Sequence, residues 1–478
     1  MGKSKDYMTL GMNGKSLFGV VLAVAVFVLM LFGLPDTFSE EAKRMTAIVS
    51  FGVILWIFES VPIGLTAIIV LLLMLLFDVG GPELVYSGFA SPAVFLIIGG
   101  MMIAGAVNRT TLVKRVTYHI LHRWGTTSRG LVGSLIIIQQ IQAIFIPTTA
   151  VRSTLILPVA SMMIDTIGAK RDSNLRKLIA LGATFGGNIS GTAILTAAIG
   201  NILTVELVKQ FTGVNITYFQ WFLYTFPIWL LLVPSIWFLL LKLYPLPTDQ
   251  RVFPSVQEEM RKKLEELGPL NREEIRCLVI LLFIVGLWVT EPLHGFHPSI
   301  PALAGAVLMT LPGIGVAHWE DVIKINFGTV LLLGVTLSMG YALTESGAAT
   351  TISRYLSAEW FLAIMREPLL AIAVVILLAQ IFHKVISNVS TAVVTFIPIM
   401  VSVAVNAGAD PVVIGFTAGL ASLHGFMLIV ETMPNLLAHG TGLITQRDLL
   451  KPGFFATLLS MVIMLIVAAT WWKVIGFL

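Results

Sequence analysis

The chain has 478 residues, of which 57% are hydrophobic and only 12% are charged, and its mean hydropathy is +0.92. A soluble domain carries about 25% charged residues, so this composition excludes an ordinary soluble protein and predicts a helical membrane protein with several spans. The net charge of +4 is explained by lysines and arginines beside the spans, so we expect no nucleic-acid partner.

The first half of the chain contains apolar segments that are long enough to cross a bilayer. A basic segment precedes the first of them and no small-residue cleavage site follows, so we expect a first transmembrane helix and not a removed signal peptide. The predicted spans and apolar blocks lie at 16–34, 44–60, 62–78, 92–109, 131–165, 178–210 and 219–243. Pro147, Thr148, Thr149 and Arg152 interrupt the fifth of these, and the letters GGNISGT interrupt the sixth.

A polar linker at 245–274 divides the chain into two halves, 1–244 and 275–478, and the second half runs in the same order as the first. Its spans and blocks are predicted at 275–290, 299–313, 328–346, 368–406, 411–430 and 453–476. The letters HKVISNVST interrupt the apolar block of this half, and ETMPN breaks the segment that follows it. Each half has an odd number of crossings, so we predict two inverted repeats.

The predicted fold is therefore an all-α polytopic membrane protein of about 11 transmembrane helices, in two inverted repeats that each contain a re-entrant helical hairpin and a broken helix. The hairpins are expected at about 131–165 and 368–406. This architecture is common among secondary transporters, whose binding sites lie near the membrane midplane between the repeats.

The distribution of lysine and arginine predicts the orientation. If the N-terminus is cytoplasmic, the segments 109–129 and 169–177, the linker, and the loop with Arg447 and Lys451 are cytoplasmic too. These segments hold most of the basic loop residues, as the positive-inside rule requires. We expect an integral protein of a bacterial inner membrane with a cytoplasmic N-terminus.

Polar breaks inside apolar blocks suit ion binding. The freed amides at a helix N-terminus bind anions, and freed carbonyls with asparagine, serine and threonine oxygens suit sodium. The alternative is that these residues only cap kinked helices, which would explain one isolated cluster better. Four polar breaks in two matching pairs favour a transport site.

Several segments resemble the divalent anion–sodium symporter (DASS) family, over nearly the whole chain. These are ESVPIGLTAIIVLLLMLLFDVGG, LEELGPLNREEIR, PSIPALAGAVLMTLPGIGVAHWEDV, INFGTVLLLGVTLSMGYALTESG and SLHGFMLIVETMPNLLAHGTGLI. The resemblance implies eleven spans and two hairpins, divided between a scaffold domain and a moving transport domain that are interleaved across both repeats. It also implies a homodimer and elevator-type transport of a di- or tricarboxylate or sulfate. Most members couple this transport to sodium, and one branch exchanges anions.

The family's hairpin tips carry Ser-Asn-Thr, and this chain keeps the pattern unequally. The second tip keeps Ser387 and Asn388, with Val389 in place of the threonine. The first tip has Thr148 and Thr149 instead, and looks more like the exchanger branch.

The last broken helix keeps Thr432, Pro434 and Asn435 of the family's Ala-Thr-Pro-Pro-Asn run, with Glu431 and Met433 replacing the alanine and the first proline. Together, the resemblance implies a set of substrate-binding residues: Thr148, Thr149, Arg152, Ser387, Asn388 and Thr432. It implies sodium ligands among Ser387, Asn388, Thr391, Glu431 and Asn188. Apart from sodium as a coupling ion, no cofactor is expected.

Arg152 and Glu431 are unusual charges for such apolar surroundings. Arg152 has three interpretations: a fixed cation that replaces sodium and pairs with the substrate, a partner in a structural ion pair, or a side chain that extends to the cytoplasmic surface. Glu431 has functional interpretations, which are to ligate sodium, to bind a coupling proton, or to pair with Lys384 or Arg152, and a structural one, which is an interfacial ion pair outside the site.

The predicted function is secondary active transport of a divalent anion by an elevator-type mechanism, coupled to sodium. The alternative is sodium-independent anion exchange. A membrane-embedded enzyme would need a nucleophile–base pair or a metal cluster at membrane depth, and the sequence has no recognisable triad. A channel is the other rival, and paired hairpins favour stoichiometric binding over a continuous pore.

Overall fold

The computed structural model describes residues 14–246, 253–356, 358–386 and 389–478, and these residues form helices and connecting segments with no strand. The predicted all-α class is confirmed. The first-half helices are α1 (Gly14–Gly33), α2 (Glu40–Phe58), α3 (Ile63–Leu76), α4 (Gly81–Ser87), η1 (Gly88–Ala90), α5 (Pro92–Val107), α6 (Leu112–Trp124), α7 (Ser128–Phe145), α8 (Thr149–Ile167), α9 (Asn174–Ile189), η2 (Leu195–Ala197), α10 (Ile199–Thr212) and α11 (Tyr218–Leu243).

The described part of the linker contains one helix, and the second half again alternates long helices with short ones. These elements are α12 (Pro254–Leu267), α13 (Arg272–Val289), α14 (Glu291–His294), α15 (Ser299–Thr310), α16 (Trp319–Val322), α17 (Phe327–Glu345), α18 (Ala348–Leu356), α19 (Glu359–Arg366), α20 (Pro368–Val385), α21 (Val389–Ala407), α22 (Pro411–Ser422), α23 (Met433–Gly440), α24 (Gln446–Val467) and η4 (Ala468–Trp472).

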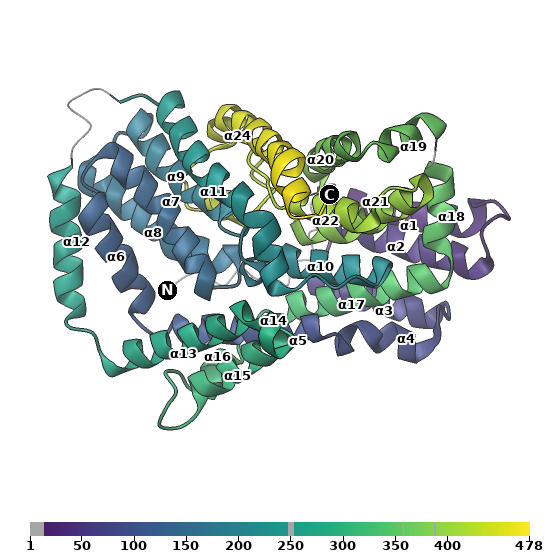
Figure 1. The fold of residues 1–478 in the computed structure, drawn as a ribbon, viewed down its shortest axis with the longest axis horizontal. Coiled ribbons are helices and arrows are strands. Elements are labelled where there is room, and N and C mark those ends of the chain that lie inside the picture. The colour runs from purple at the N-terminus through teal and green to yellow at the C-terminus, as the bar shows by residue number, and fades with distance from the viewer. Residues whose placement is uncertain (1–13, 247–252, 357, 387–388) are drawn as a thin grey trace.

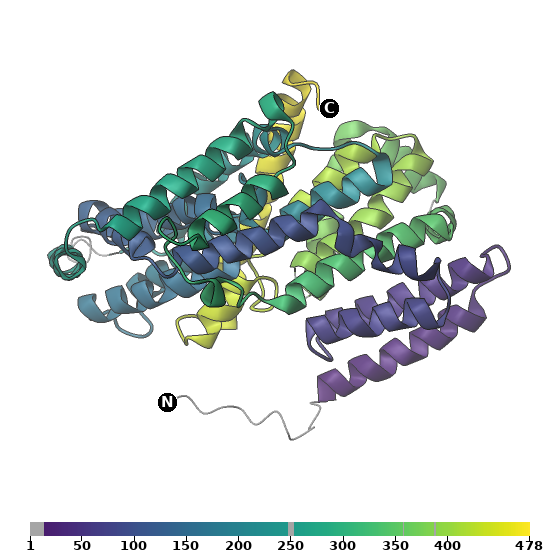
Figure 2. The ribbon, with the colours of Figure 1, turned by 90° about the horizontal axis from the view of Figure 1, so that it is seen from below.

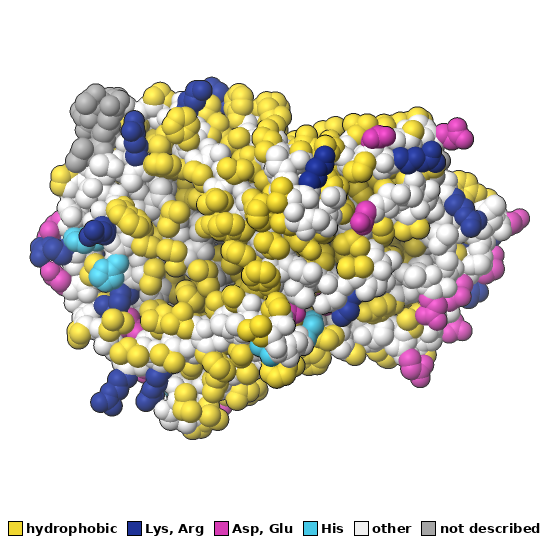
Figure 3. All heavy atoms as spheres, viewed as in Figure 1, with side chains coloured by type: hydrophobic (Ala, Val, Ile, Leu, Met, Phe, Trp, Pro, Cys, Tyr) yellow, Lys and Arg dark blue, Asp and Glu magenta, His cyan; other side chains and the backbone are white. Residues whose placement is uncertain are grey.

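Among the described residues, seven helices are long and apolar enough to cross a membrane, or eight if α19 and α20, which meet at a bend of 116°, form one span. Three shorter apolar helices, α3, α15 and α22, add to them. Figure 3 shows hydrophobic side chains over the middle of one face, with charged side chains gathered toward its two ends. The chain is an integral membrane protein, whereas eleven crossings and inverted repeats stay predictions.

Both interrupted blocks consist of two helices with a short break between them. In the first, α7 ends at Phe145 and α8 begins at Thr149. Pro147 explains this break, because proline lacks an N–H and disfavours helical backbone at the residue before it; Ile146 is accordingly extended, with φ −114° and ψ 107°. In the second block, Ile386 ends α20 in a similar conformation, with φ −97° and ψ 121°.

The two broken helices cross-connect the two blocks. The helix α8 packs against α9 and α23, and α21 packs against α22 and α10. The broken helix of the first half consists of α9 and α10, and that of the second half consists of α22 and α23. The second helix of each block therefore contacts the first part of the broken helix in its own half and the last part of the broken helix in the other half. In Figure 1, α7, α8 and α9 lie toward one end of the molecule and α20, α21 and α22 toward the other, while α10 reaches the second group.

The hydrophobic core is divided between two clusters. One joins α2, α3 and α4 to α17, and the other holds the blocks, the broken helices and α5, α11, α13 and α24. In Figure 2 the N-terminal helices α1, α2 and α3 form a layer of their own at one edge of the molecule. The helix α17 contributes several residues to each cluster and so connects the two.

A buried ion pair ties α6 to the start of the second half. The Arg115 guanidinium donates to both carboxylate oxygens of Glu274, at 2.9 and 3.0 Å, and to the carbonyls of Gly268 and Pro269 at 2.8 and 3.2 Å. The exposed fractions of the two side chains are 9% and 0%. Arg115 therefore also satisfies the backbone where the linker helix α12 ends.

We expect Glu274→Gln to lower the free energy of unfolding by about 1.5–3 kcal/mol, because an amide replaces the charged acceptor of a buried guanidinium. The matched control is Glu258→Gln, whose partner Arg261 is 53% exposed, and for which we expect a clearly smaller loss because water screens an exposed pair. Thermal unfolding in detergent measures both variants. Equal shifts would mean that the Arg115 pair contributes no more than a surface pair.

Candidate binding site at the two broken helices

The two broken helices meet through side-chain amides. Asn188, one residue before α9 ends, donates to the carbonyl of Gly425 at 2.9 Å and to the side-chain oxygen of Asn435 at 2.8 Å. The Thr432 hydroxyl donates to the side-chain oxygen of Asn188 at 2.8 Å and also caps α23 by accepting from the Asn435 backbone N–H. Asn435 in turn donates to the carbonyl of Leu428 at 2.9 Å. All three side chains are buried, so this network fixes the two breaks against each other.

Arg152 lies beside the first break and is fully buried. Its Nε donates to the Ser190 hydroxyl at 3.1 Å, and its Nη1 donates to the carbonyls of Ala197, at 2.9 Å, and of Ile146. The guanidinium thus joins the tip of the first block to the interruption between α9 and α10. Burial excludes the interpretation in which this side chain extends to the cytoplasmic surface, and no described carboxylate pairs with it.

The remaining nitrogen of Arg152, Nη2, is buried and has no hydrogen-bond partner among the described residues. It lies beside Gly191, where an added Cβ would be 4.0 Å from Nη2 and 3.8 Å from the methyl of the tip residue Thr149. The neighbouring Thr148 caps α8, since its hydroxyl accepts from the backbone N–H of Val151 at 3.4 Å. The structure therefore brings Thr148, Thr149 and Arg152 to one helix N-terminus, where backbone amides and the helix dipole also favour an anion.

Glu431 is fully buried where the second broken helix is interrupted, and it pairs with Lys384 at 2.9 Å. Its other oxygen accepts from the Met427 backbone N–H at 2.9 Å. His383 Nε2 lies 3.0 Å from the Glu431 carbonyl oxygen. Of the two partners considered from the sequence, the structure selects Lys384. The last turn of α20 is thereby fixed to the second break.

The remaining predicted residues belong to the second tip. Ser387 and Asn388 lie outside the described residues. Thr391 is buried in the first turn of α21, and its hydroxyl has no hydrogen-bond partner within the described part of the chain. The structure thus gives contacts for Asn188, Glu431 and Thr432, and their ligation of sodium or substrate stays a prediction.

Sequence reasoning missed several residues that support the two breaks. The Thr192 hydroxyl lies 3.0 Å from His424 Nε2, and Asn201 donates to the carbonyls of Gly191 and Ile194 at 2.7 and 2.9 Å. Thr192 belongs to the letters GGNISGT that interrupt the sixth apolar block, and Asn201 lies nine residues beyond it in the same block. The described residues contain no group of three or more histidine, cysteine or acidic side chains placed to hold a metal ion.

Paired broken helices in a membrane protein are typical of secondary transporters. Here buried amides join the two broken helices, and a buried guanidinium lies beside them. Residues 14–478 match the family model described as the sodium:sulfate symporter transmembrane region, and the chain belongs to this family. The family consists of transporters and not of enzymes.

Similar proteins agree with this family. A chain from Cupriavidus necator, named membrane protein, is 26% identical over 96% of this chain and 93% of its own length. The sodium-dependent dicarboxylate transporter SdcS of Staphylococcus saprophyticus is 25% identical over 95% of this chain and 91% of its own. The crystal structure of the Alcanivorax borkumensis YdaH transporter has a similar fold, with a TM-score of 0.56, 14% identity, and coverage of 83% of this chain and 88% of that one.

Proposed function

We propose that this transporter carries a divalent anion, either a dicarboxylate, a tricarboxylate or a sulfate-like ion, between the two tips by an elevator-type mechanism. The observation that carries the proposal is the buried Arg152, whose Nη2 lies beside Gly191 and has no partner among the described residues. A guanidinium is suited to carboxylate and sulfate oxygens. The relatives named as sodium-dependent dicarboxylate transporters favour a dicarboxylate and sodium coupling.

In this proposal no sodium ion binds at the first tip. Arg152 already binds the Ser190 hydroxyl and the carbonyls of Ile146 and Ala197, which are hard oxygen donors of the kind that sodium needs. A fixed cation among these oxygens excludes sodium by repulsion. Sodium coupling then depends on the second tip, with ligands drawn from Ser387, Asn388, Thr391, Glu431 and Asn188. Sodium-independent anion exchange is the second candidate function. It is favoured by the same proposal, in which the Arg152 guanidinium takes the place of a sodium ion.

The proposed organisation follows the predicted repeats, with 1–244 and 275–478 inverted about the linker 245–274. The cross-packing of α8 with α23 and of α21 with α10 supports this symmetry. The proposal also includes a bacterial inner membrane, a cytoplasmic N-terminus and a homodimer.

Uptake by proteoliposomes tests the function. Radiolabelled succinate, citrate and sulfate are offered separately, with and without an inward sodium gradient and with and without internal unlabelled anion. We expect saturable uptake of at least one anion that rises with sodium. Uptake that needs internal anion and ignores sodium would select the exchanger, and no saturable uptake of any anion would contradict the proposal.

We expect Asn388→Ala to abolish uptake while expression and thermal unfolding stay normal, because the side-chain amide is proposed to contact both substrate and sodium. The matched control is Asn108→Ala, an exposed residue at the end of α5, which should transport normally. Uptake by Asn388→Ala within the range of this control would remove the second tip from the site.

A further inference from the structure

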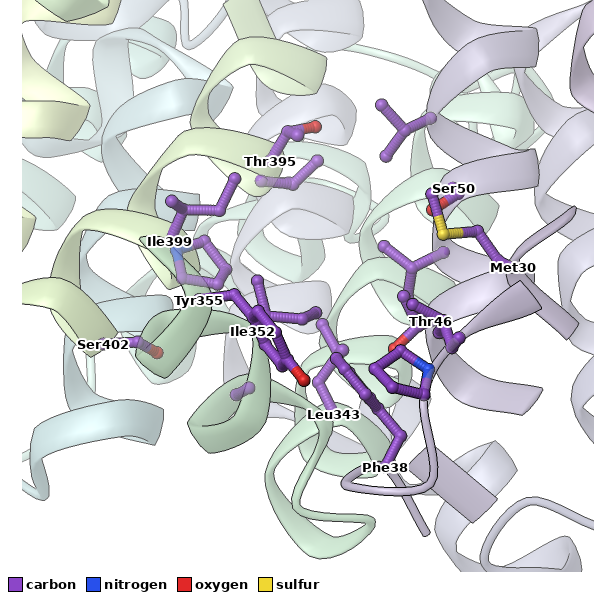
Figure 4. A pocket seen from close by; sticks show the side chains of 17 residues that line it. Met30, Phe38, Thr46, Ser50, Leu343, Ile352, Tyr355, Thr395, Ile399 and Ser402 are labelled. Carbon is purple, nitrogen blue, oxygen red and sulfur yellow. The ribbon is translucent and has the colours of Figure 1, made fainter. Parts of the chain in front are cut away.

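A large cavity separates the N-terminal helices from the second block. It lies between α1 and α2 on one side and α21 on the other, with α17 and α18 closing it, and its volume is about 420 Å³. Figure 4 shows Thr395 and Ile399 of α21 facing Met30, Thr46 and Ser50 across this space. This is within the size range of small-molecule sites, roughly 300–1,000 Å³. Arg152, Asn188 and Glu431 do not line this cavity.

The lining has the chemistry of a hydrocarbon site. None of the described lining residues is charged. The two threonine hydroxyls of the lining are already bonded to backbone: Thr46 donates to the Ala42 carbonyl at 2.7 Å, and Thr395 donates to the Thr391 carbonyl at 2.8 Å. An anionic substrate would therefore lose its hydration here without a cationic partner, which is strongly unfavourable.

The cavity is continuous with the surface that faces lipid. Met30 of α1 lines it, and the neighbouring side chains Leu29 and Phe32 are 63% and 80% exposed. At the end near the α1–α2 connection, Phe38 stacks on Tyr355 with ring centroids 5.7 Å apart. The Tyr355 hydroxyl is 2.7 Å from that of Thr37. Tyrosine with its ring in an apolar wall and its hydroxyl beside polar groups is typical of the level where lipid headgroups begin.

We propose that an acyl chain of a bilayer phospholipid occupies this cavity, entering beside α1 with its headgroup near Tyr355. The acyl chain would fill the space that the side chains of α2 and α21 leave between them. Water is the poorer occupant, because an apolar cavity offers it too few hydrogen-bond partners.

A phospholipid with a photoactivatable diazirine on its acyl chain tests the proposal. The full chain is reconstituted in vesicles containing this probe and irradiated, and adducts are located by peptide mass spectrometry. We expect adducts on the lining residue Val394, which is only 8% exposed, as well as on Leu458 of α24, which is 48% exposed. Ile397, fully buried in α21 and absent from the lining, supplies the background. Adduct yield at Val394 no higher than at Ile397 would overturn the proposal.

A variant whose side chain fills the cavity provides a second test in the same labelling experiment. Val49→Trp places a large ring in the space and should reduce the adducts at Val394 to background while Leu458 is labelled as before. The matched control is Val462→Trp on the exposed face of α24, where the parent side chain is 46% exposed, and it should leave both yields unchanged. If Val49→Trp fails to fold, Ser402→Leu introduces a smaller apolar side chain at the opposite wall. Reaction of Ser402→Cys with a water-soluble maleimide, beyond that of the parent with its buried Cys277, would place water in the cavity and overturn the proposal.

Discussion

Arg152→Gln is expected to lower substrate affinity at least about a hundredfold, and added sodium should not restore it. The substitution removes a charge and leaves at least one of the carbonyls of Ile146 and Ala197 without its donor. A hydrogen bond to a charged group contributes about 1.5–3 kcal/mol, and the loss of the charge itself adds to this, so the total is expected to reach the roughly 2.8 kcal/mol that corresponds to a hundredfold change in Kd. Concentration-dependent uptake in proteoliposomes measures the affinity, with the most rapidly transported of succinate, citrate and sulfate.

Two matched variants separate charge from structure. Arg152→Lys keeps the charge without the planar fork and should weaken affinity by about 1.5–3 kcal/mol. Ser190→Ala removes one partner of Arg152 but keeps its charge, and should weaken affinity by no more than about 1.5 kcal/mol. If Arg152→Gln binds substrate as the parent does while its unfolding temperature falls, the arginine only supports the break.

Glu431→Gln is expected to lower the free energy of unfolding by about 3 kcal/mol. Removing one partner of a fully buried ion pair costs about 3–5 kcal/mol, and the lower end applies because the Lys384 side chain is 25% exposed. Lys384→Met should destabilise more, since it leaves the fully buried carboxylate with only the Met427 N–H as a described donor. Thermal unfolding in detergent measures both.

The combined variant Lys384→Met with Glu431→Leu distinguishes the pair from a sodium site. Replacing both partners of a buried pair by apolar residues is often close to neutral, so its stability should recover most of the loss. If Glu431 instead ligates sodium, Glu431→Gln should change the sodium dependence of uptake and leave unfolding nearly unaltered. That result would assign the carboxylate to the ion and not to Lys384.

The sequence predicted the fold class well because helices in a membrane are strongly constrained. Backbone groups in hydrocarbon must be satisfied within the segment, so long apolar runs predict helices, and Pro147 predicts the break that ends α7. The expected spans at 16–34 and 219–243 correspond closely to α1 and α11. The count of crossings was harder, because α3, α15 and α22 are short and a short apolar helix has no feature that tells a span from a buried segment.

The site was predicted as a set of residues but not as a set of contacts. Thr432 and Asn188 were both singled out, and the structure joins them at 2.8 Å. The partners of Arg152 escaped prediction because two of them are backbone carbonyls, which every residue carries. The contact between Thr192 and His424 escaped it because it joins positions 232 residues apart. The cavity beside α2 also has no signal in the sequence, since a void depends on how side chains from several helices fail to fill a space.

The positive charge of Arg152 cannot dissociate from the protein, and this affects how a membrane potential acts on transport. A sodium ion leaves the protein after each delivery, whereas the positive charge of an arginine stays with the chain. If the element that carries Arg152 crosses the field, each elementary charge moved through the full potential is worth about 2.3 kcal/mol per 100 mV. The unloaded carrier would then reset at a rate that depends on voltage, because an inside-negative potential resists the outward return of its positive charge. A bound dianion alone would reverse the sign of the moving charge, and one sodium ion bound with it at the second tip would cancel that charge.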